Sequence, residues 1–273
     1  MIHKTVGALG CRPPRPPPSS MTARTWLTLP TYNEVANIER ILRAIVAQLE
    51  RAIPGDFRVL VIDDSSPDGT GEVADRLAEE IPEVCVLHRK EKDGLGRAYL
   101  AGFQYAVDHG AELVGVMDAD FSHDPAYLPL LLEAANDADL VIGSRYVEGG
   151  PIADWPPLRR VLSRGGSLYA RSILGVHVRD LTGGFKFIRR EVLERIDLNS
   201  LRAQGYVFNI ELTYRALMLG CSVKEIPIVF RDRKEGRSKM SLPVAIEALF
   251  LVPKLRRSHQ RVEAARAEET AAA

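Results

Sequence analysis

The fold is predicted first from one stretch of the sequence, Leu113-Val114-Gly115-Val116-Met117-Asp118-Ala119-Asp120. Its apolar part predicts a buried strand that ends in two carboxylates. Side chains two residues apart on a strand point to opposite faces, so both aspartates can serve one centre only if the chain bends there. Converging carboxylates suit a hard divalent cation that shares its coordination with phosphates. Asp-x-Asp alone also occurs by chance in loops that follow strands.

Around this stretch, residues 24–143 alternate between short apolar runs and amphipathic segments. This alternation is typical of βαβ units, so we expect an α/β fold with a mostly parallel central sheet flanked by helices. The predicted strands are Thr25–Leu29, Phe57–Ile62, Val84–His88, Leu113–Met117 and Leu140–Gly143. The predicted helices are Val35–Gln48, Gly71–Glu80, Leu95–Val107 and Pro125–Ala135.

The second half is less regular. Trp155–Leu174 predicts a helix pair or one helix broken at Gly165-Gly166, because glycine weakens a helix interior. The remaining expected elements are strands at Phe185–Ile188 and Val223–Phe230, helices at Glu191–Ile196 and Phe208–Leu219, and an apolar segment at Ser241–Leu255. These elements are expected to complete one domain and build the site of a second substrate.

The composition sets the limits of the domain and its surroundings. Lys+Arg and Asp+Glu are balanced at 36 each in 273 residues, which gives no indication of a nucleic-acid partner. We expect a disordered Pro-rich extension at 1–22, one domain at 23–257 and a flexible tail at 258–273. No apolar run reaches the roughly 18 residues that a membrane-spanning helix needs. The three cysteines have no metal-binding spacing and are typical of reduced thiols in the cytosol.

Two loops after predicted strands carry groups that can bind a nucleotide. In Pro30-Thr31-Tyr32-Asn33-Glu34, proline is expected to stop the strand and Asn33 to cap the next helix, while Tyr32 offers an aromatic face. In the segment 63–70, Asp64 is the better candidate for a ligand contact and Asp68 for turn structure. The alternative for both loops is ordinary turn chemistry.

Basic residues mark a second kind of site. Arg145 follows the predicted strand at 140–143, on the same edge as the aspartates, and can bind phosphate through two parallel hydrogen bonds, although a salt bridge at this edge is the usual alternative. Arg159, Ser163 and Arg164 fall at helical spacing beside apolar residues, which suits a membrane interface or simple packing. The charged loop at 230–239 is suited to closing over a diphosphate, although such runs are more often solvated surface.

Together these segments resemble the polyprenol-phosphate mannose synthases, also called dolichyl-phosphate mannosyltransferases, within the inverting GT-A glycosyltransferases. The resemblance covers about residues 24–255. It rests on seven motifs in order: Pro-Thr-Tyr-Asn-Glu at 30–34, Asp-Asp-Ser-Ser-Pro-Asp-Gly-Thr at 63–70, Met-Asp-Ala-Asp-Phe-Ser-His at 117–123, Gly-Ser-Arg-Tyr at 143–146, Asp-Leu-Thr-Gly-Gly-Phe at 180–185, Gly-Tyr-Val-Phe at 205–208 and Asp-Arg-x-x-Gly-x-Ser-Lys at 232–239.

The resemblance implies a role for each matching position. The nucleotide sugar would be held by Pro30, Tyr32, Glu34, Ile62, Asp64, Asp118, Ala119, Asp120, Arg233 and Lys239. Asp118 and Asp120 would bind Mg²⁺ or Mn²⁺, and Ser122 stands where some relatives place a glutamine ligand. The lipid phosphate would be held by Arg145, Arg159 and Ser163, with Asp118, Asp120 and Arg145 as the catalytic set.

The implied reaction is transfer of mannose from GDP-mannose to a polyprenyl monophosphate with inversion. The implied location is peripheral, at the cytoplasmic face of a membrane, reached through amphipathic segments of the chain or through a separate membrane-anchoring subunit. Two alternatives remain open at this point. One is a glucosyltransferase that uses UDP-glucose on the same lipid, and the other is a non-catalytic subunit that only binds the nucleotide sugar.

Overall fold

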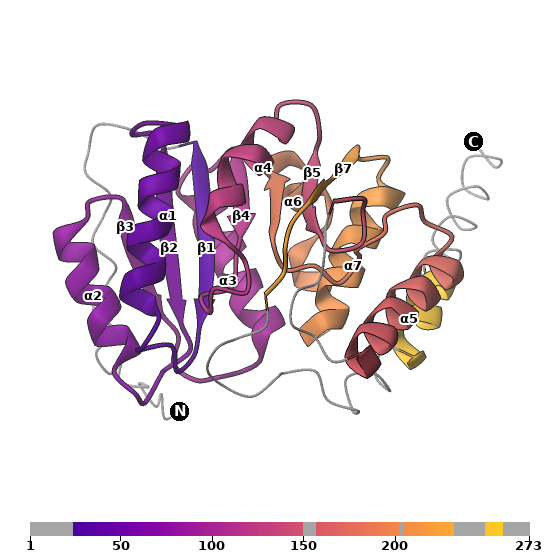
Figure 1. Ribbon diagram of the computed structural model, residues 1–273, viewed down its shortest axis with the longest axis horizontal. Helices are drawn as coiled ribbons and strands as arrows, with labels where there is room; N and C mark the ends of the chain where they lie inside the picture. Colours follow the sequence, from indigo (N-terminus) through magenta and orange to yellow (C-terminus); the bar gives the residue numbers. More distant parts are fainter. Residues whose placement is uncertain (1–23, 150–156, 202–204, 232–248, 259–273) are drawn as a thin grey trace, which may run out of the picture.

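A computed structural model describes residues 24–149, 157–201, 205–231 and 249–258. Its centre is a seven-stranded sheet in the order β3-β2-β1-β4-β6-β5-β7, with helices on both faces (Figure 1). The strands are β1 Thr25–Thr31, β2 Phe57–Asp63, β3 Val84–His88, β4 Leu113–Val116, β5 Leu140–Ser144, β6 Lys186–Arg189 and β7 Val223–Pro227. Only β6 runs antiparallel to its neighbours, so the predicted, mostly parallel α/β sheet is confirmed.

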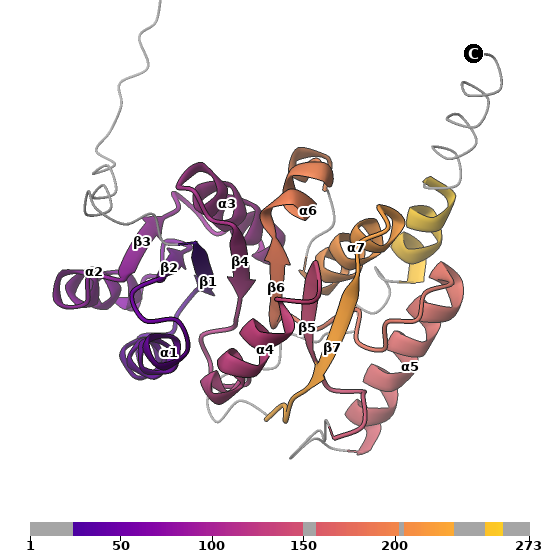
Figure 2. The same cartoon turned by 90° about the horizontal axis from the view of Figure 1, so that it is seen from above.

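The helices fall into two layers and one end group. The layer formed by α1, α2 and α4 packs on one face of the sheet, and α3, α6 and α7 pack on the other (Figure 2). Their bounds are α1 Ile38–Ala52, α2 Thr70–Glu80, α3 Leu95–Asp108, α4 Leu128–Ala134, α5 Pro157–Leu174, α6 Arg190–Arg195 and α7 Gly205–Met218, with short 3-10 turns at Pro125–Tyr127 and Leu198–Ser200. Helix α5 and the helical residues 249–258 lie side by side beyond the β7 end of the sheet.

Strands buried on both faces explain the continuous apolar runs of the first half. In β2, for example, Val59 and Val61 pack under α1 and α2, while Leu60 and Ile62 pack under α3. The polar ends of the same strands then reach the surface at one edge. The core therefore holds the strand ends in fixed positions, which is what a site built from loops requires.

Four local predictions are wrong. Strand β1 does not stop at Pro30 but continues to Thr31. The ladder between β1 and β4 ends at Thr28, whose carbonyl accepts the N–H of Met117. Successive residues of a strand direct their main-chain groups toward alternate neighbouring strands, so the nitrogen of Pro30 points to the same side as the carbonyl of Thr28. Because the ladder with β4 has already ended at this point, no N–H donor is needed there.

The second error concerns Asn33, which does not cap α1. It adopts a left-handed φ of 58°, and the helix begins only at Ile38. The third concerns α5, which is one continuous helix through Gly165 and Gly166. The expected strand at Val223–Phe230 also ends earlier, at Pro227. The predictions for 1–22 and, apart from Ser258, for 258–273 concern segments outside the described residues.

None of the helices in the described part of the chain has the length and apolar character needed to cross a membrane.

Candidate active site

The ends of four parallel strands meet at one edge of the sheet. Because β1, β2, β4 and β5 all point the same way, the segments that follow Thr31, Asp63, Val116 and Ser144 share this edge. In open α/β sheets, ligands bind in the crevice beyond the carboxyl ends of the strands. The sequence predictions for the two acidic loops and for Arg145 therefore fall in one region.

The chain bends at Asp118 and Asp120, as it must if both carboxylates are to serve one centre. Strand β4 ends at Val116, and Phe121 takes a left-handed φ of 59°. The turn is held by Asp120, whose Oδ1 accepts the N–H of Ser122 at 3.0 Å. Asp120 is buried, while the Asp118 side chain is 28% exposed. One carboxylate is thus fixed by the turn and the other is open to a ligand.

The residues around the bend fit a small divalent cation. The hydroxyl of Ser122 is buried and has no hydrogen-bond partner within the described residues, so an oxygen ligand is present beside the two carboxylates. No group of three His, Cys, Asp or Glu side chains that could hold a metal occurs in the described ranges. Mg²⁺ commonly uses one or two carboxylates and takes its remaining ligands from water and substrate phosphates. A donor set of two carboxylates and a hydroxyl agrees with that pattern.

The imidazole of His123 supports the bend at Asp118–Asp120. Its Nδ1 accepts the N–H of Asp118 at 3.2 Å, so that nitrogen carries no proton in this arrangement. Burial lowers the pKa of His123, although Asp118 and Asp120 both act to raise it. The ring stacks on Phe185, with the centroids 5.1 Å apart. His123 is therefore a neutral, packed support for the acid pair.

The segment after residue 180 reaches the acid pair from another side. A Cβ built on Gly184 would lie 3.3 Å from the Tyr99 hydroxyl and 3.8 Å from Asp118 Oδ1. A side chain at this position would push on Tyr99 and narrow the space beside the Asp118 carboxylate. Glycine at 184 thus allows the backbone to approach the acid pair closely.

The two predicted nucleotide loops are joined to each other. The N–H groups of Asn33, Glu34 and Val35 donate to Ser66 Oγ, Thr70 Oγ1 and Asp68 Oδ2 respectively. Asp68 also accepts the N–H and hydroxyl of Thr70, which confirms its structural role. The N–H of Asp64 also donates to the carbonyl of Thr31 at 3.1 Å. The loop after β2 therefore fixes the loop after β1.

Two basic residues, Arg89 and Lys92, contact this region. Arg89, the residue after β3, donates to Asp64 Oδ1 at 2.5 Å. Burial raises the pKa of Asp64, while Arg89 acts to lower it. The ammonium of Lys92 lies 3.6 Å from the centroid of the Tyr32 ring. Both predicted ligand residues thus carry a cation beside them.

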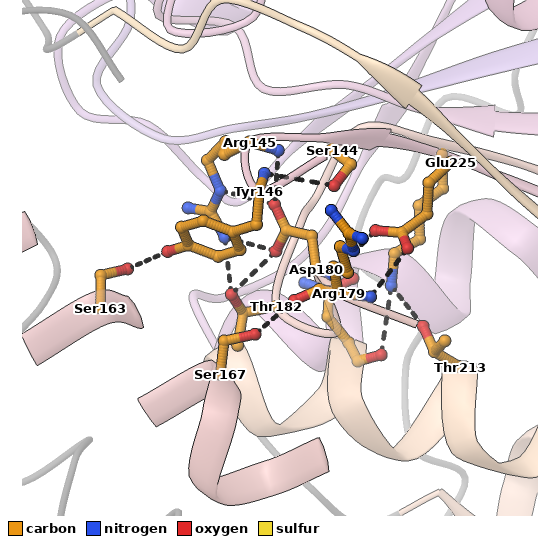
Figure 3. A network of polar contacts seen from close by, with 12 residues as sticks. Ser144, Arg145, Tyr146, Ser163, Ser167, Arg179, Asp180, Thr182, Thr213 and Glu225 are labelled. Atoms are coloured by element: carbon orange, nitrogen blue, oxygen red, sulfur yellow. Dashed lines mark hydrogen bonds and ion pairs between the residues drawn. The ribbon is translucent and has the colours of Figure 1, made fainter. Parts of the chain in front are cut away.

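Arg145 is held by a buried carboxylate. Its Nε and Nη2 donate to Asp180 Oδ2 and Oδ1 at 2.8 and 2.7 Å, and Nη2 also donates to Thr182 Oγ1 at 2.6 Å (Figure 3). Burial acts to raise the pKa of Asp180, but the Arg145 guanidinium outweighs it and holds that pKa below its usual range. The fork is therefore an ion pair with a fixed plane.

Ser163 is brought close to Arg145 through Tyr146. The hydroxyls of Tyr146 and Ser163 are 2.5 Å apart, which ties the end of β5 to α5 (Figure 3). Arg159 lies on α5, one helical turn before Ser163, as the sequence spacing predicts. Arg233 and Lys239 are outside the described residues. The predicted phosphate-binding roles of Arg159, Arg233 and Lys239 are therefore not tested by side-chain contacts.

A fully buried lysine lies beside this fork. Lys186 Nζ donates to the carbonyl of Asn209 at 3.1 Å and to Thr213 Oγ1 at 2.8 Å. Burial lowers its pKa to about 7, against the attraction of Asp180. Asp180 and Thr182 belong to the motif at 180–185, but the resemblance implied a role for neither residue. The one sequence signal for Asp180 and Lys186 is that each is a charged residue within an otherwise apolar segment.

Curated relatives match most of the chain. The undecaprenyl-phosphate mannosyltransferase of Micrococcus luteus is 46% identical over 229 residues, which cover 84% of this chain and 92% of the relative. The polyprenol monophosphomannose synthase of Mycolicibacterium smegmatis is 49% identical over 233 residues, which cover 85% of this chain and 86% of the relative.

Solved structures share the fold at lower identity. A glucosyl-3-phosphoglycerate synthase from Mycobacterium tuberculosis, in complex with Mn²⁺, UDP-glucose and phosphoglyceric acid, is 20% identical with a TM-score of 0.60; the match covers 85% of this chain and 80% of that one. A mannosyltransferase from Pyrobaculum calidifontis, in complex with GDP-Man and Mn²⁺, is 20% identical with a TM-score of 0.54, covering 90% and 75%.

The family model for glycosyl transferase family 2 matches residues 27–197, which include the acid pair, Arg145 and Asp180. With this match and two relatives close to half identical over most of their length, the chain belongs to glycosyl transferase family 2.

Proposed function

We propose that the protein transfers mannose from GDP-mannose to a polyprenyl monophosphate and inverts the anomeric carbon, giving the β-linked lipid product. One observation carries this proposal: a bent acid pair suited to a metal diphosphate and a fixed arginine fork share one edge of the sheet. Two separate anion sites at one edge suit a reaction that joins two phosphorylated substrates. The names of the two close relatives support mannose as the sugar and polyprenyl phosphate as the acceptor.

On the donor side, the guanosine would lie between the two joined loops. Tyr32 and Asp64 supply an aromatic face and a carboxylate, and Pro30 and Glu34 complete the wall, while Ile62, which is fully buried under α3, would support it from the core. Asp118 and Asp120, with the main chain at Ala119 between them, would bind the diphosphate together with Mg²⁺ or Mn²⁺, and Ser122 offers a further oxygen. Such a cation supplies positive charge that stabilises a departing diphosphate.

On the acceptor side, Arg145 would bind the lipid phosphate, with Arg159 and Ser163 of α5 beside it. Arg233 and Lys239 would close over the donor. The residues thus hold two anions together that would otherwise repel each other. Positioning of this kind is a large part of the catalysis of bimolecular reactions.

The chemistry needs no strong base. The second pKa of a phosphate monoester is about 6, so the acceptor oxygen is already largely ionised near neutral pH. This oxygen forms a bond to the anomeric carbon while the bond from that carbon to the β-phosphate oxygen of GDP breaks, and GDP leaves with the electron pair. The carboxylates therefore serve to hold the leaving group, and neither has to accept a proton.

The exposed apolar side chains at one end of the molecule support a peripheral membrane location. Leu168 of α5 is 61% exposed, and Leu249 and Phe250 are 51% and 76% exposed. They belong to two segments that are joined, because the Tyr169 hydroxyl donates to the carbonyl of Leu249. Exposed Arg164, Arg256 and Arg257 flank them, as expected of a surface that meets anionic lipid.

The cytoplasmic face is the side of the membrane that we propose. Cys85 and Cys221 are both free thiols, and free thiols are usual in the reducing cytosol. A separate membrane-anchoring subunit is the alternative means of attachment. Binding of the purified protein to protein-free vesicles would make such a subunit unnecessary for attachment.

A direct assay tests the function. Purified protein is incubated with Mg²⁺, a polyprenyl phosphate and labelled GDP-mannose, UDP-glucose or UDP-galactose, and label is measured in the organic phase. We expect a lipid product from GDP-mannose and much less from the other donors. Absence of a product from GDP-mannose, or label from UDP-glucose instead, would refute the proposed substrate.

A further inference from the structure

A short segment links the acceptor side of the site to the donor side. Asp180, at its start, holds Arg145, and Gly184, at its end, lies beside the Asp118 carboxylate. The segment is also anchored independently of Arg145. The N–H groups of Arg179 and Asp180 both donate to the carboxylate of Glu225 on β7, at 2.7 and 2.9 Å. Asp180 is therefore a fixed point against which Arg145 is placed, and not the reverse.

The contact between Arg145 and Asp180 is directional. Two parallel bonds set the plane of the guanidinium, and a third bond from Nη2 to Thr182 Oγ1 fixes its rotation within that plane. The rings of Tyr146 and Phe230 lie 5.2 and 5.4 Å from its central carbon. These three bonds use Nε and both N–H groups of Nη2, so a phosphate would be bound through the two N–H groups of Nη1, whose direction this arrangement sets.

The energetics argue against a purely stabilising role. The Asp180 side chain is completely buried and that of Arg145 is 7% exposed. Removing two charges from water costs about as much as their attraction returns, so a buried ion pair is weak evidence for stability. Because the ion pair adds little stability, its role is better explained by the direction that it gives to the Arg145 guanidinium at the edge of the site.

We propose that Asp180 is a positioning residue for the acceptor: its carboxylate, helped by the Thr182 hydroxyl, fixes the guanidinium of Arg145 in the orientation that binds the acceptor's phosphate. The inference rests on the proposed function for the identity of that phosphate. Asp180 itself touches no substrate in this role and acts only through Arg145.

Charge and orientation make opposite predictions for one substitution. Asp180→Asn keeps the shape of the side chain but removes a negative charge close to the phosphate site. If only charge mattered, the acceptor dianion would bind more tightly to the variant. If Asp180 acts by positioning, the amide loses one arm of the fork and the acceptor binds more weakly.

The experiment measures the dissociation constant of a short-chain polyprenyl phosphate by calorimetry, with Mn²⁺ and GDP present, for wild-type protein and Asp180→Asn. We expect the constant to rise about tenfold or more, while the constant for GDP-mannose changes less than twofold. Asp139→Asn, which alters a carboxylate that bonds to Ser222, is the matched control and leaves both constants unchanged. Tighter or unchanged acceptor binding by Asp180→Asn overturns the inference.

A double-mutant cycle separates positioning from a general structural effect. In an Arg145→Lys background the fork cannot form, so Asp180→Asn should then weaken acceptor binding by less than twofold. Equal effects in both backgrounds would show that Asp180 does not act through Arg145. If Asp180→Asn does not fold, Thr182→Val takes its place, with an expected threefold weakening and no change in donor affinity; an unchanged acceptor constant for this variant overturns the inference.

Binding and turnover are read separately, so the two proposals fail separately. Wild-type protein that binds the polyprenyl phosphate but forms no mannosylated lipid would refute the proposed function and leave the inference standing. Wild-type protein that does not bind the phosphate at all would refute both.

Discussion

Asp120 has an observed structural role, and we propose a second, metal-binding role for the same carboxylate. One oxygen holds the turn through the N–H of Ser122, and the charge is available to a cation at the bend. Asp120→Asn keeps an oxygen that can accept this bond but removes the charge. We expect the turn to survive and Mn²⁺-dependent binding of GDP-mannose to weaken at least tenfold, about 1.4 kcal/mol, as calorimetry would show.

The same substitution at Asp124 is the matched control. Asp124 lies in the same loop and accepts the N–H of Ala126, which asparagine can also do. We expect Asp124→Asn to bind the donor as the wild type does. Equal loss of affinity in the two variants would mean that loop structure, and not the charge of Asp120, determines donor binding.

Lys186 gives the stability of the protein a predictable dependence on pH. Its folded-state pKa is about 7, whereas that of lysine in an unfolded chain is about 10.4. Between these values the unfolded chain binds the proton and the folded chain does not, so the free energy of unfolding rises with pH. Below pH 7 both states bind it, and the cost of burying the ammonium is fully present. The Lys186 contribution therefore increases from about pH 7 upward, by at most ~1.4 kcal/mol per pH unit.

Comparison with Lys186→Met isolates this contribution. The variant loses the bonds to Asn209 and Thr213, a loss that does not vary with pH in this range. We expect the wild type to gain ~1–3 kcal/mol relative to the variant between pH 7 and 9, as measured by urea unfolding. Parallel stability curves for the two proteins would show that Lys186 does not titrate near pH 7 in the fold.

At the scale of the element, α5 shows what glycine costs inside a helix. Gly165 and Gly166 lie in its interior, and a Cβ at either position would meet nothing within 4 Å. Alanine should therefore stabilise the helix by ~0.5–1 kcal/mol at each position, measured as the change in the free energy of unfolding.

Gly175, at the end of the same helix, is the control. A Cβ would also meet nothing there, but the residue has a left-handed φ of 70° and closes the helix by donating to the carbonyl of Arg171. Gly175→Ala should destabilise the protein by ~1 kcal/mol. A loss of stability in Gly165→Ala or Gly166→Ala would indicate that the middle of α5 needs glycine for a reason other than packing.

The prediction of a break in α5 failed because propensity is a local quantity. The helix is continuous because Ala170 and Leu174 pack into the core beside α7, and this burial outweighs two unfavourable glycines. The strands and helices of the first half were predicted closely because their periodic patterns are set by burial on both faces. Pro30 was misjudged because its tolerance depends on where β4 ends, which the local sequence does not contain.

The candidate site was predictable to the extent that its residues follow strands. The ends of β1, β2, β4 and β5 carry the motifs, and the parallel sheet brings them together. Partners from distant segments could not be predicted in the same way. Asp180 is 35 residues from Arg145, and Arg89 is 25 residues from Asp64, so only the fold shows that these charges are paired.

At the scale of the whole molecule, the apolar side chains of α5 and of residues 249–258 share one end. The two segments are joined twice, because the Arg256 guanidinium also donates to the carbonyl of Ile173. Val252 is fully buried in the same core as α7, while its neighbour Phe250 is 76% exposed. An anchored helix that exposes a large aromatic ring gives the proposed lipid-facing surface a fixed relation to Ser163 and Arg145, the proposed acceptor side of the site.

This relation leads to a prediction on membrane binding. Phe250→Ser and Leu168→Ser should each weaken binding to vesicles of anionic lipid about tenfold or more, because each removes ~1.5–3 kcal/mol of apolar transfer when its side chain is fully buried in lipid. Leu130→Ser is the matched control, since Leu130 is 49% exposed but lies on α4. Cosedimentation at low and high salt measures the binding, and salt should weaken it further through the flanking arginines. Equal effects of all three substitutions would show that the end formed by α5 and residues 249–258 is not the surface that meets the lipid.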